Sequence, residues 1–332
     1  MTQTRPDTSV TAARSAGNDA RSGANRTGLL IALGSAASFA LAGSLGTALL
    51  SIGWTPAAAV GVRIGGAFLV LLVPCLLLLR RTGLPSRGQL GRLVAYGVIA
   101  VAGAQLCYFS AMQYLSVGVA LLLEYTAPII LIGYHWVRTR RRPATLVFVG
   151  AAAAIAGLVL VLDPGQNAVI SPIGVAWALA AALCACGYFL LSENTTRRKA
   201  ARPGVPEQPV SPLLLVTAGT GVGGLLIVLL GLTGLMPLRA TTQNASLGGL
   251  LLPWWLPVLV LILLSAVLAY LLGIAGIRRL GSGVASFVAL TEVVFAVLFA
   301  AVLLDQHPGV GQLIGGVLVL IGIAAVQRGD RR

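Results

Sequence analysis

Long apolar runs alternate with short polar or basic connections along almost the whole chain. Ten of these runs are about 20 residues long, the length at which a helix crosses a ~30 Å hydrocarbon core. They cover roughly residues 28–50, 55–79, 92–112, 116–137, 144–162, 171–192, 211–235, 253–277, 281–303 and 308–326. Clusters of Pro, Gly and Arg separate them, as expected for turns between helices. The pattern therefore predicts an all-α membrane protein with ten transmembrane helices.

The composition agrees with a bilayer protein. Hydrophobic residues make up 57% of the 332 positions and charged residues only 10%, against about 25% charged residues in soluble domains. Residues 1–27 are polar and contain no apolar core of a signal peptide, so we expect them to form a disordered cytoplasmic tail. Residues 327–332 are expected to form a short cytoplasmic end.

The basic residues predict the orientation of the chain. Of the 23 Lys and Arg residues, 21 lie in the N-terminal tail, the C-terminal end and every second connection, at residues 80–92, 138–142, 197–202 and 278–279. Basic residues gather on the cytoplasmic side of membrane proteins. We therefore expect a multi-pass protein of the cytoplasmic membrane with both termini in the cytoplasm. The net charge of +14 then reflects topology and contact with anionic lipids, and predicts no nucleic-acid partner.

The second half of the chain repeats the first. A shift of 165 residues places Gly118 on Gly283, Thr126 on Thr291, Pro143 on Pro308, Gly150 on Gly315 and Gly157 on Gly322. Residues 28–163 and 170–326 are thus expected to form two five-helix repeats. Because five is odd, the second repeat enters the membrane inverted. Inverted repeats build carriers that work by alternating access, with the binding site near the midplane, but they are also compatible with a channel or uncoupled facilitator.

Short motifs in both halves resemble a known family. They are Tyr108-Phe109-Ser110-Ala111 with Val119-Ala120, and Ala275-Gly276 with Val284-Ala285-Ser286 and Leu290-Thr291-Glu292. Together they resemble the EamA-type ten-helix carriers of the drug/metabolite transporter superfamily. The stretch from Leu123 to Pro128 is most similar to members that export amino acids and related metabolites. The chain departs from the family in having Val293 where Pro is common, and in having Gly219 where the second repeat aligns with Arg63.

Three charged residues fall deep within the predicted spans: Arg63, Glu124 and Glu292. A charge at the bilayer centre is unfavourable by roughly 2.5–3.5 kcal/mol, so these side chains are expected to face each other, water or a substrate. A rise of 1.5 Å per residue places all three at a similar depth, ~12–13 Å from the outer surface. For Glu124, the alternatives are a cavity carboxylate that binds an ammonium group or a proton, and a structural partner of Arg63. For Glu292 and Arg63, a functional and a structural role likewise both remain open.

Polar and aromatic side chains in the spans extend the candidate site. We predict substrate-binding or coupling roles for Gln105, Tyr108, Trp177, Tyr188 and Tyr270, against the alternative of core packing with one hydrogen bond each. Pro128 is expected to kink its helix one turn after Glu124 and is a candidate hinge.

Other chemistry finds no support in the sequence. The four cysteines lie in apolar runs without nearby histidine, which predicts no metal site, and no catalytic constellation or nucleotide-binding loop predicts an enzyme or a cofactor. The expected partners are a small-molecule substrate, a proton or exchanged solute as the energy source, and the lipid bilayer. The sequence leaves a monomer and a homodimer open.

Overall fold

The computed structural model describes residues 8–112, 114–115, 117–140, 142–162, 171–196, 209–303 and 309–330. The first repeat contains α1 (Thr8–Ser51), α2 (Pro56–Thr82), α3 (Arg87–Ala95), the π-helical segment η1 (Tyr96–Gly103), α4 (Ala104–Met112), α5 (Val117–Glu124), α6 (Ala127–Thr139) and α7 (Thr145–Leu162). The second contains α8 (Pro172–Thr196), α9 (Pro212–Leu232), β1 (Ala245–Leu247), β2 (Leu250–Leu252), α10 (Trp255–Ile262), the π-helical segment η2 (Leu263–Leu268), α11 (Ala269–Leu280), α12 (Ser282–Ala289), α13 (Thr291–Leu303) and α14 (Val310–Asp330).

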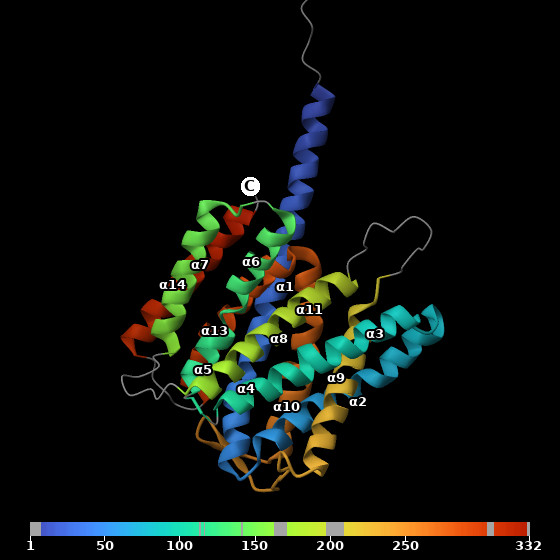
Figure 1. Ribbon diagram of the computed structural model, residues 1–332, viewed down its shortest axis with the longest axis vertical. Helices are drawn as coiled ribbons and strands as arrows, with labels where there is room; N and C mark the ends of the chain where they lie inside the picture. Colours follow the sequence, from blue (N-terminus) through green and yellow to red (C-terminus); the bar gives the residue numbers. More distant parts are fainter. Residues whose placement is uncertain are drawn as a thin grey trace, which may run out of the picture.

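These elements form ten membrane crossings. Within the described part of the chain, eight helical stretches are long and apolar enough to span a bilayer. Two further crossings are the apolar helix α7 and the pair α5–α6, which is interrupted at its middle. The start of α1 and the end of α14 lie at the same end of the bundle, as an even number of crossings requires (Figure 1). The predicted fold class is therefore confirmed.

Helix starts follow from local capping, and they repeat between the halves. The Thr55 side chain accepts a bond from the Ala58 backbone N–H (3.3 Å) before Pro56, and Ser211 accepts one from the Leu214 N–H (3.2 Å) before Pro212. A hydroxyl cap followed by Pro is a favoured helix start, because Pro has a fixed φ and needs no acceptor there. The same device thus begins the second span of each repeat.

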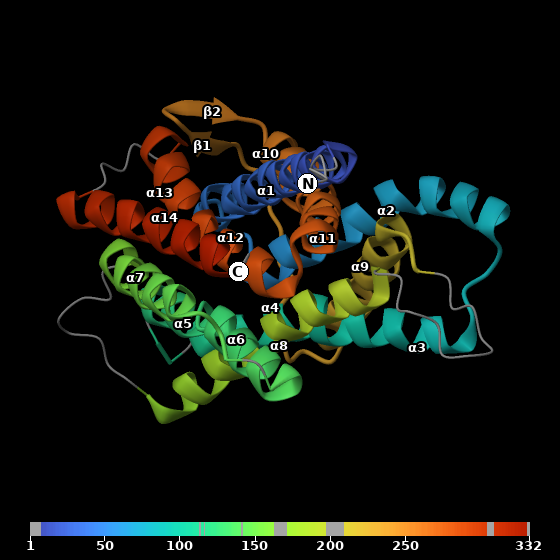
Figure 2. The same ribbon diagram turned by 90° about the horizontal axis from the view of Figure 1, so that it is seen from above.

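Helices α7 and α14 show how the two repeats are related. They lie side by side in both views (Figures 1 and 2) and contact each other through glycines. A Cβ built on Gly157 would lie 2.5 Å from the carbonyl oxygen of Gly315, and one on Gly150 would lie 2.7 Å from that of Gly322. The 165-residue shift exchanges these two contacts, because Gly150 corresponds to Gly315 and Gly157 to Gly322. Helices α7 and α14 are equivalent in the two repeats and run antiparallel, so their reciprocal contacts define a two-fold axis perpendicular to both helices. This relation is the inverted repeat expected from the sequence.

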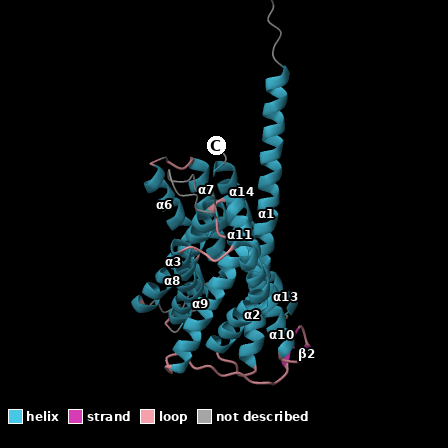
Figure 3. Ribbon diagram, turned by 90° about the vertical axis from the view of Figure 1, so that its right-hand side faces the viewer, coloured by secondary structure: helices cyan, strands magenta, loops and turns pink. Residues whose placement is uncertain are grey.

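Two features differ from the sequence expectation. The helix α1 begins at Thr8, so residues 8–27 are helical and not the disordered tail that was expected. Ala and Arg, both strong helix formers, are frequent in this segment, and it continues directly into the first span (Figure 3). A short antiparallel hairpin, β1–β2, lies at the opposite end of the bundle and was not predicted (Figure 3). Residues 1–7, the basic connection 197–202 and residues 331–332 lie outside the described part.

Candidate functional site

The fourth span is broken beside Glu124. Helix α5 ends at Glu124, Tyr125 and Thr126 form a turn, and α6 begins at Ala127. The Thr126 hydroxyl donates to the carbonyl oxygen of Leu123 (2.6 Å) and so closes the end of α5. Pro128 lies in the first turn of α6 and has no N–H to donate to the Glu124 carbonyl four residues earlier. The break therefore lies where Pro128 was expected to kink the helix, and it places Glu124 at the end of a half-helix.

The ninth span is broken at the equivalent point. Helix α12 ends at Ala289 and α13 begins at Thr291, whose hydroxyl donates to the Val288 carbonyl oxygen (2.7 Å). The 165-residue shift maps Thr126 and Leu123 onto this pair. Glu292 lies in the first turn of α13. Each repeat thus carries one glutamate next to the same break, although the two glutamates are not themselves equivalent.

Equivalent π-helical segments also occur in the third and eighth spans. The 165-residue shift maps residues 98–103, within η1, onto η2. A π-helical turn is widened relative to an α-helix and is frequent at functional sites. Each repeat therefore departs from regular α-helix at two equivalent positions, the break in its fourth helix and the π-helical segment in its third.

A cavity of about 770 Å³ lies between the two repeats. Its size is within the range of small-molecule sites, 300–1,000 Å³. Seven of the eight candidate site residues and the candidate hinge line it, namely Arg63, Gln105, Tyr108, Glu124, Tyr188, Tyr270, Glu292 and Pro128. Side chains from both repeats thus converge on one hollow.

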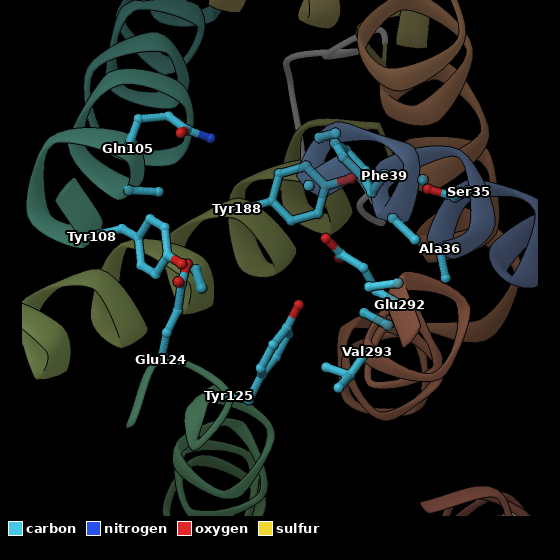
Figure 4. Close-up of a pocket in the computed structure, with 18 of the residues that line it drawn as sticks. Ser35, Ala36, Phe39, Gln105, Tyr108, Glu124, Tyr125, Tyr188, Glu292 and Val293 are labelled. Carbon is cyan, nitrogen blue, oxygen red and sulfur yellow. The ribbon is translucent and has the colours of Figure 1, made fainter. Parts of the chain in front are cut away.

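The two carboxylates face this hollow from different sides (Figure 4). The Tyr108 hydroxyl lies beside the Glu124 carboxylate, with which it interacts electrostatically. The Tyr125 hydroxyl points toward Glu292 from α6's side of the hollow. Both glutamates are half-buried. Glu292 lies at the N-terminus of α13, where the helix dipole compensates a negative charge, whereas Glu124 lies at the C-terminus of α5, where the dipole favours a nearby cation.

Arg63 is 9% exposed and forms its hydrogen bond with the backbone. Its Nη2 donates to the carbonyl oxygen of Ser265 (2.7 Å), which belongs to η2. The guanidinium carbon lies 5.7 Å from the ring centroid of Phe39, a cation–π contact. Among the described residues, Arg63 makes no ion pair within 4.0 Å with either glutamate, although Glu292 is close enough to act on it electrostatically. Arg63 thus joins α2 of one repeat to η2 of the other.

Trp177 is the candidate that the structure places elsewhere. It is 40% exposed and does not line the cavity, although its helix α8 contributes Tyr188. The two residues lie on a common helical face, but Trp177 is eleven positions, or ~16 Å, closer to the start of the helix. In contrast, Phe39 and Tyr125 line the cavity and were missed from the sequence. Tyr125 lies within the stretch that was singled out, next to Glu124, whereas Phe39 carries no distinguishing signal in its apolar run.

The cavity differs at its two ends. Towards residues 47–56, its lining includes the exposed residues Thr47, Leu50 and Pro56. Towards the arginine-rich end, its lining ends at buried residues such as Ala32 and Ile277.

Beyond that buried end, one polar contact joins the two repeats, and a second fixes it within the second repeat. His135 Nε2 and Ser282 Oγ are 2.9 Å apart, and the Ser282 backbone N–H donates to Glu193 Oε2 (3.0 Å). These residues come from α6 of the first repeat and from α12 and α8 of the second. The cavity therefore has exposed residues in its lining at one end and buried residues at the other, where the His135–Ser282 contact joins the repeats.

Two inverted five-helix halves around a shared, mainly apolar cavity with two carboxylates in its lining are the architecture of a multi-pass membrane transporter. The profile of the EamA-like transporter family matches residues 26–163 and 172–327, one stretch for each repeat. The chain belongs to this family, and its being a transporter rather than an enzyme is thereby confirmed.

Solved structures share the fold. Twenty-nine chains match, among them a crystal structure of a protein with 18% sequence identity and a TM-score of 0.68. That match covers 94% of this chain and 99% of the other. A comparison with curated protein sequences gives no significant match. The similarity to solved structures concerns the fold alone.

Proposed function

We propose that this protein is a secondary transporter that exports amino acids or related small metabolites across the cytoplasmic membrane by alternating access. The observation that carries the proposal is the cavity between inverted repeats, whose lining is exposed at one end and buried at the other, next to the His135–Ser282 contact between the repeats. Exchanging the conformations of two such halves moves the opening to the opposite face of the membrane. The paired breaks in the fourth and ninth spans are where each half can bend, with Pro128 as the hinge candidate.

The substrate class is supported by the lining of the cavity. Glu124 and Glu292 provide negative charge for an ammonium group, and the four tyrosines Tyr108, Tyr125, Tyr188 and Tyr270 provide apolar faces with polar tips. Gln105 adds an amide that can orient a polar group. A small amphipathic molecule with an amine fits this set.

The energy source and orientation belong to the same proposal. We assign coupling to the carboxylates of Glu124 and Glu292, which can exchange a proton for a substrate cation. The arginine-rich ends of the helices are placed in the cytoplasm together with both termini, since basic residues are retained on that side. The opening towards residues 47–56 then faces outward.

Transport by the purified protein in liposomes tests the proposal. Radiolabelled amino acids are loaded inside or outside, with and without an imposed pH gradient. We expect saturable flux that an opposite proton gradient accelerates, and counterflow when unlabelled substrate is present on the far side. Saturable flux that is indifferent to the pH gradient and shows no counterflow would identify an uncoupled facilitator instead.

A further inference from the structure

Two half-helices from opposite repeats meet at the arginine-rich end of the bundle. They are α6 and α12, the parts of the fourth and ninth spans that lie on that side of each break. His135 Nε2 on α6 lies 2.9 Å from the hydroxyl oxygen of Ser282, the first residue of α12. A Cβ built on the next residue, Gly283, would lie 3.9 Å from Cδ2 of the same ring. The imidazole of the first repeat therefore lies directly against the start of α12.

Ser282 is held in place from within its own repeat. The residue before α12 is Gly281, and no side chain of α12 caps the helix. The Glu193 carboxylate on α8 accepts a hydrogen bond from the Ser282 backbone N–H instead (3.0 Å). A carboxylate is a favoured partner of a helix N-terminus, so this bond fixes the start of α12 against α8. Ser282 is 1% exposed and thus presents its hydroxyl to His135 from a fixed position.

An apolar layer separates this polar contact from the cavity. Leu131 lies one turn before His135 on α6 and is fully buried, and Ala285 lies one turn after Ser282 on α12. Both belong to one buried cluster with Ile277 of α11. Ala285 and Ile277 also line the buried end of the cavity. The His135–Ser282 contact therefore lies behind this end, on its arginine-rich side.

The equivalent half-helices at the opposite end cannot make the same contact. The 165-residue shift maps α6 onto α13 and α12 onto α5. It pairs His135 with Ala300, Ser282 with Val117, and Leu131 with Ala296. Alanine and valine neither donate nor accept a side-chain hydrogen bond, and alanine can bury less apolar surface than leucine. The two ends of the bundle thus differ in the residues that can hold them closed.

We propose that the His135–Ser282 contact is a latch that favours the conformation in which the arginine-rich end of the cavity is closed. Exchange of the conformations of the two repeats separates α6 from α12 and brings α13 against α5, where no equivalent bond replaces the latch. An interaction that is made in one conformation only shifts the equilibrium towards that conformation. The latch rests on the alternating access of the proposed function, and it sets how often the cavity opens to the cytoplasm.

Cysteine labelling from the cytoplasmic side tests the latch. The reporter is Ile277→Cys, a buried lining position next to the latch, and an impermeant maleimide is added to inside-out vesicles that contain the full chain. The chain without the reporter measures the labelling of the four native cysteines. Loss of one hydrogen bond changes an equilibrium by about five-fold. We therefore expect His135→Ala and Ser282→Ala each to raise the labelling rate about five-fold. The double variant should raise it no further, because both changes remove the same bond.

Two control variants separate the latch from a general loosening of α6. His135→Gln keeps a side-chain N–H near the position of Nε2 and should keep the slow rate. Tyr134→Phe also removes a polar contact from α6, the bond that the Tyr134 hydroxyl accepts from Arg138 (2.6 Å), but this bond lies within one helix. It should leave the labelling rate unchanged.

An unchanged rate in either His135→Ala or Ser282→Ala, or an equal rise in Tyr134→Phe, would overturn the latch. Labelling needs no substrate, so the result does not depend on which molecules are transported. A five-fold rise in the two alanine variants without any transport of amino acids in liposomes would keep the latch and remove the proposed substrates. Transport with unchanged labelling would do the reverse.

Discussion

The contact between α7 and α14 makes a quantitative prediction for Gly157→Ala. The added Cβ would lie 2.5 Å from the carbonyl oxygen of Gly315, against 3.4 Å or more for an ordinary contact. Because that oxygen is backbone, no side chain can move aside, and the helices must separate by up to about 1 Å. Overpacking of this kind destabilises by typically 1–3 kcal/mol. We expect a loss of about 2 kcal/mol in the free energy of unfolding.

Gly133→Ala is the matched control for this change. Gly133 lies within α6, and no heavy atom lies within 4 Å of the position that its Cβ would take. Alanine is preferred over glycine in a helix by up to about 1 kcal/mol, so this variant should be neutral or more stable. Both are measured by equilibrium unfolding of the purified protein in mixed micelles. If Gly157→Ala is as stable as Gly133→Ala, the glycine contact between the repeats, and the two-fold axis drawn from it, is refuted.

Three further predictions concern transport and topology. Glu124→Gln and Glu292→Gln should each lower transport in proteoliposomes by at least about ten-fold, the effect of losing one charge-assisted hydrogen bond, without lowering expression. The control variant Trp177→Leu should transport normally. Full activity of both Gln variants would show that neither charge is needed. Arg63→Ala should reduce the yield of folded protein in size-exclusion chromatography, because it removes the bond to Ser265 that joins the repeats, and a normal yield would contradict that structural role. Ser246 is exposed in β1, at the end of the bundle opposite the arginine-rich connections. Its replacement, Ser246→Cys, should react with an impermeant maleimide added to intact cells, whereas protection there would contradict the proposed orientation.

The ten crossings and their pairing into repeats could be predicted because they depend on features written along the chain. A span needs about 20 apolar residues, and the alternation of arginines checks the count independently. The hairpin from Ala245 to Leu252 was missed because its strands are only three residues each, too short for a period-two pattern. The helix from Thr8 was missed because a polar composition suggests disorder, whereas attachment to a stable span removes the cost of helix nucleation.

The candidate site could be predicted as a set of residues but not as a set of contacts. Depth along the helices suggested that Arg63, Glu124 and Glu292 lie at one level, and all three do line the cavity, but Arg63 forms no ion pair with either glutamate among the described residues. The partner of Arg63 is a backbone carbonyl in a π-helical segment, and a backbone carbonyl has no sequence signal. Trp177 was predicted as a site residue because it shares a helical face with Tyr188. Helical spacing identifies such a face, but it does not show which part of the face lines the cavity.

The two repeats share their irregular backbone but not their charges. The breaks, their threonine bonds and the π-helical segments recur at a shift of 165 residues, whereas Glu124 corresponds to Ala289 and Glu292 to Ala127. As a result, both carboxylates lie on the half-helices α5 and α13, at the same end of the bundle as the open side of the cavity. In the proposed alternating-access cycle, symmetric bending would move the opening between faces, whereas the two charges would remain on the half-helices of one face. We therefore infer that the shared backbone provides the motion and that the unshared charges make the two directions of transport unequal.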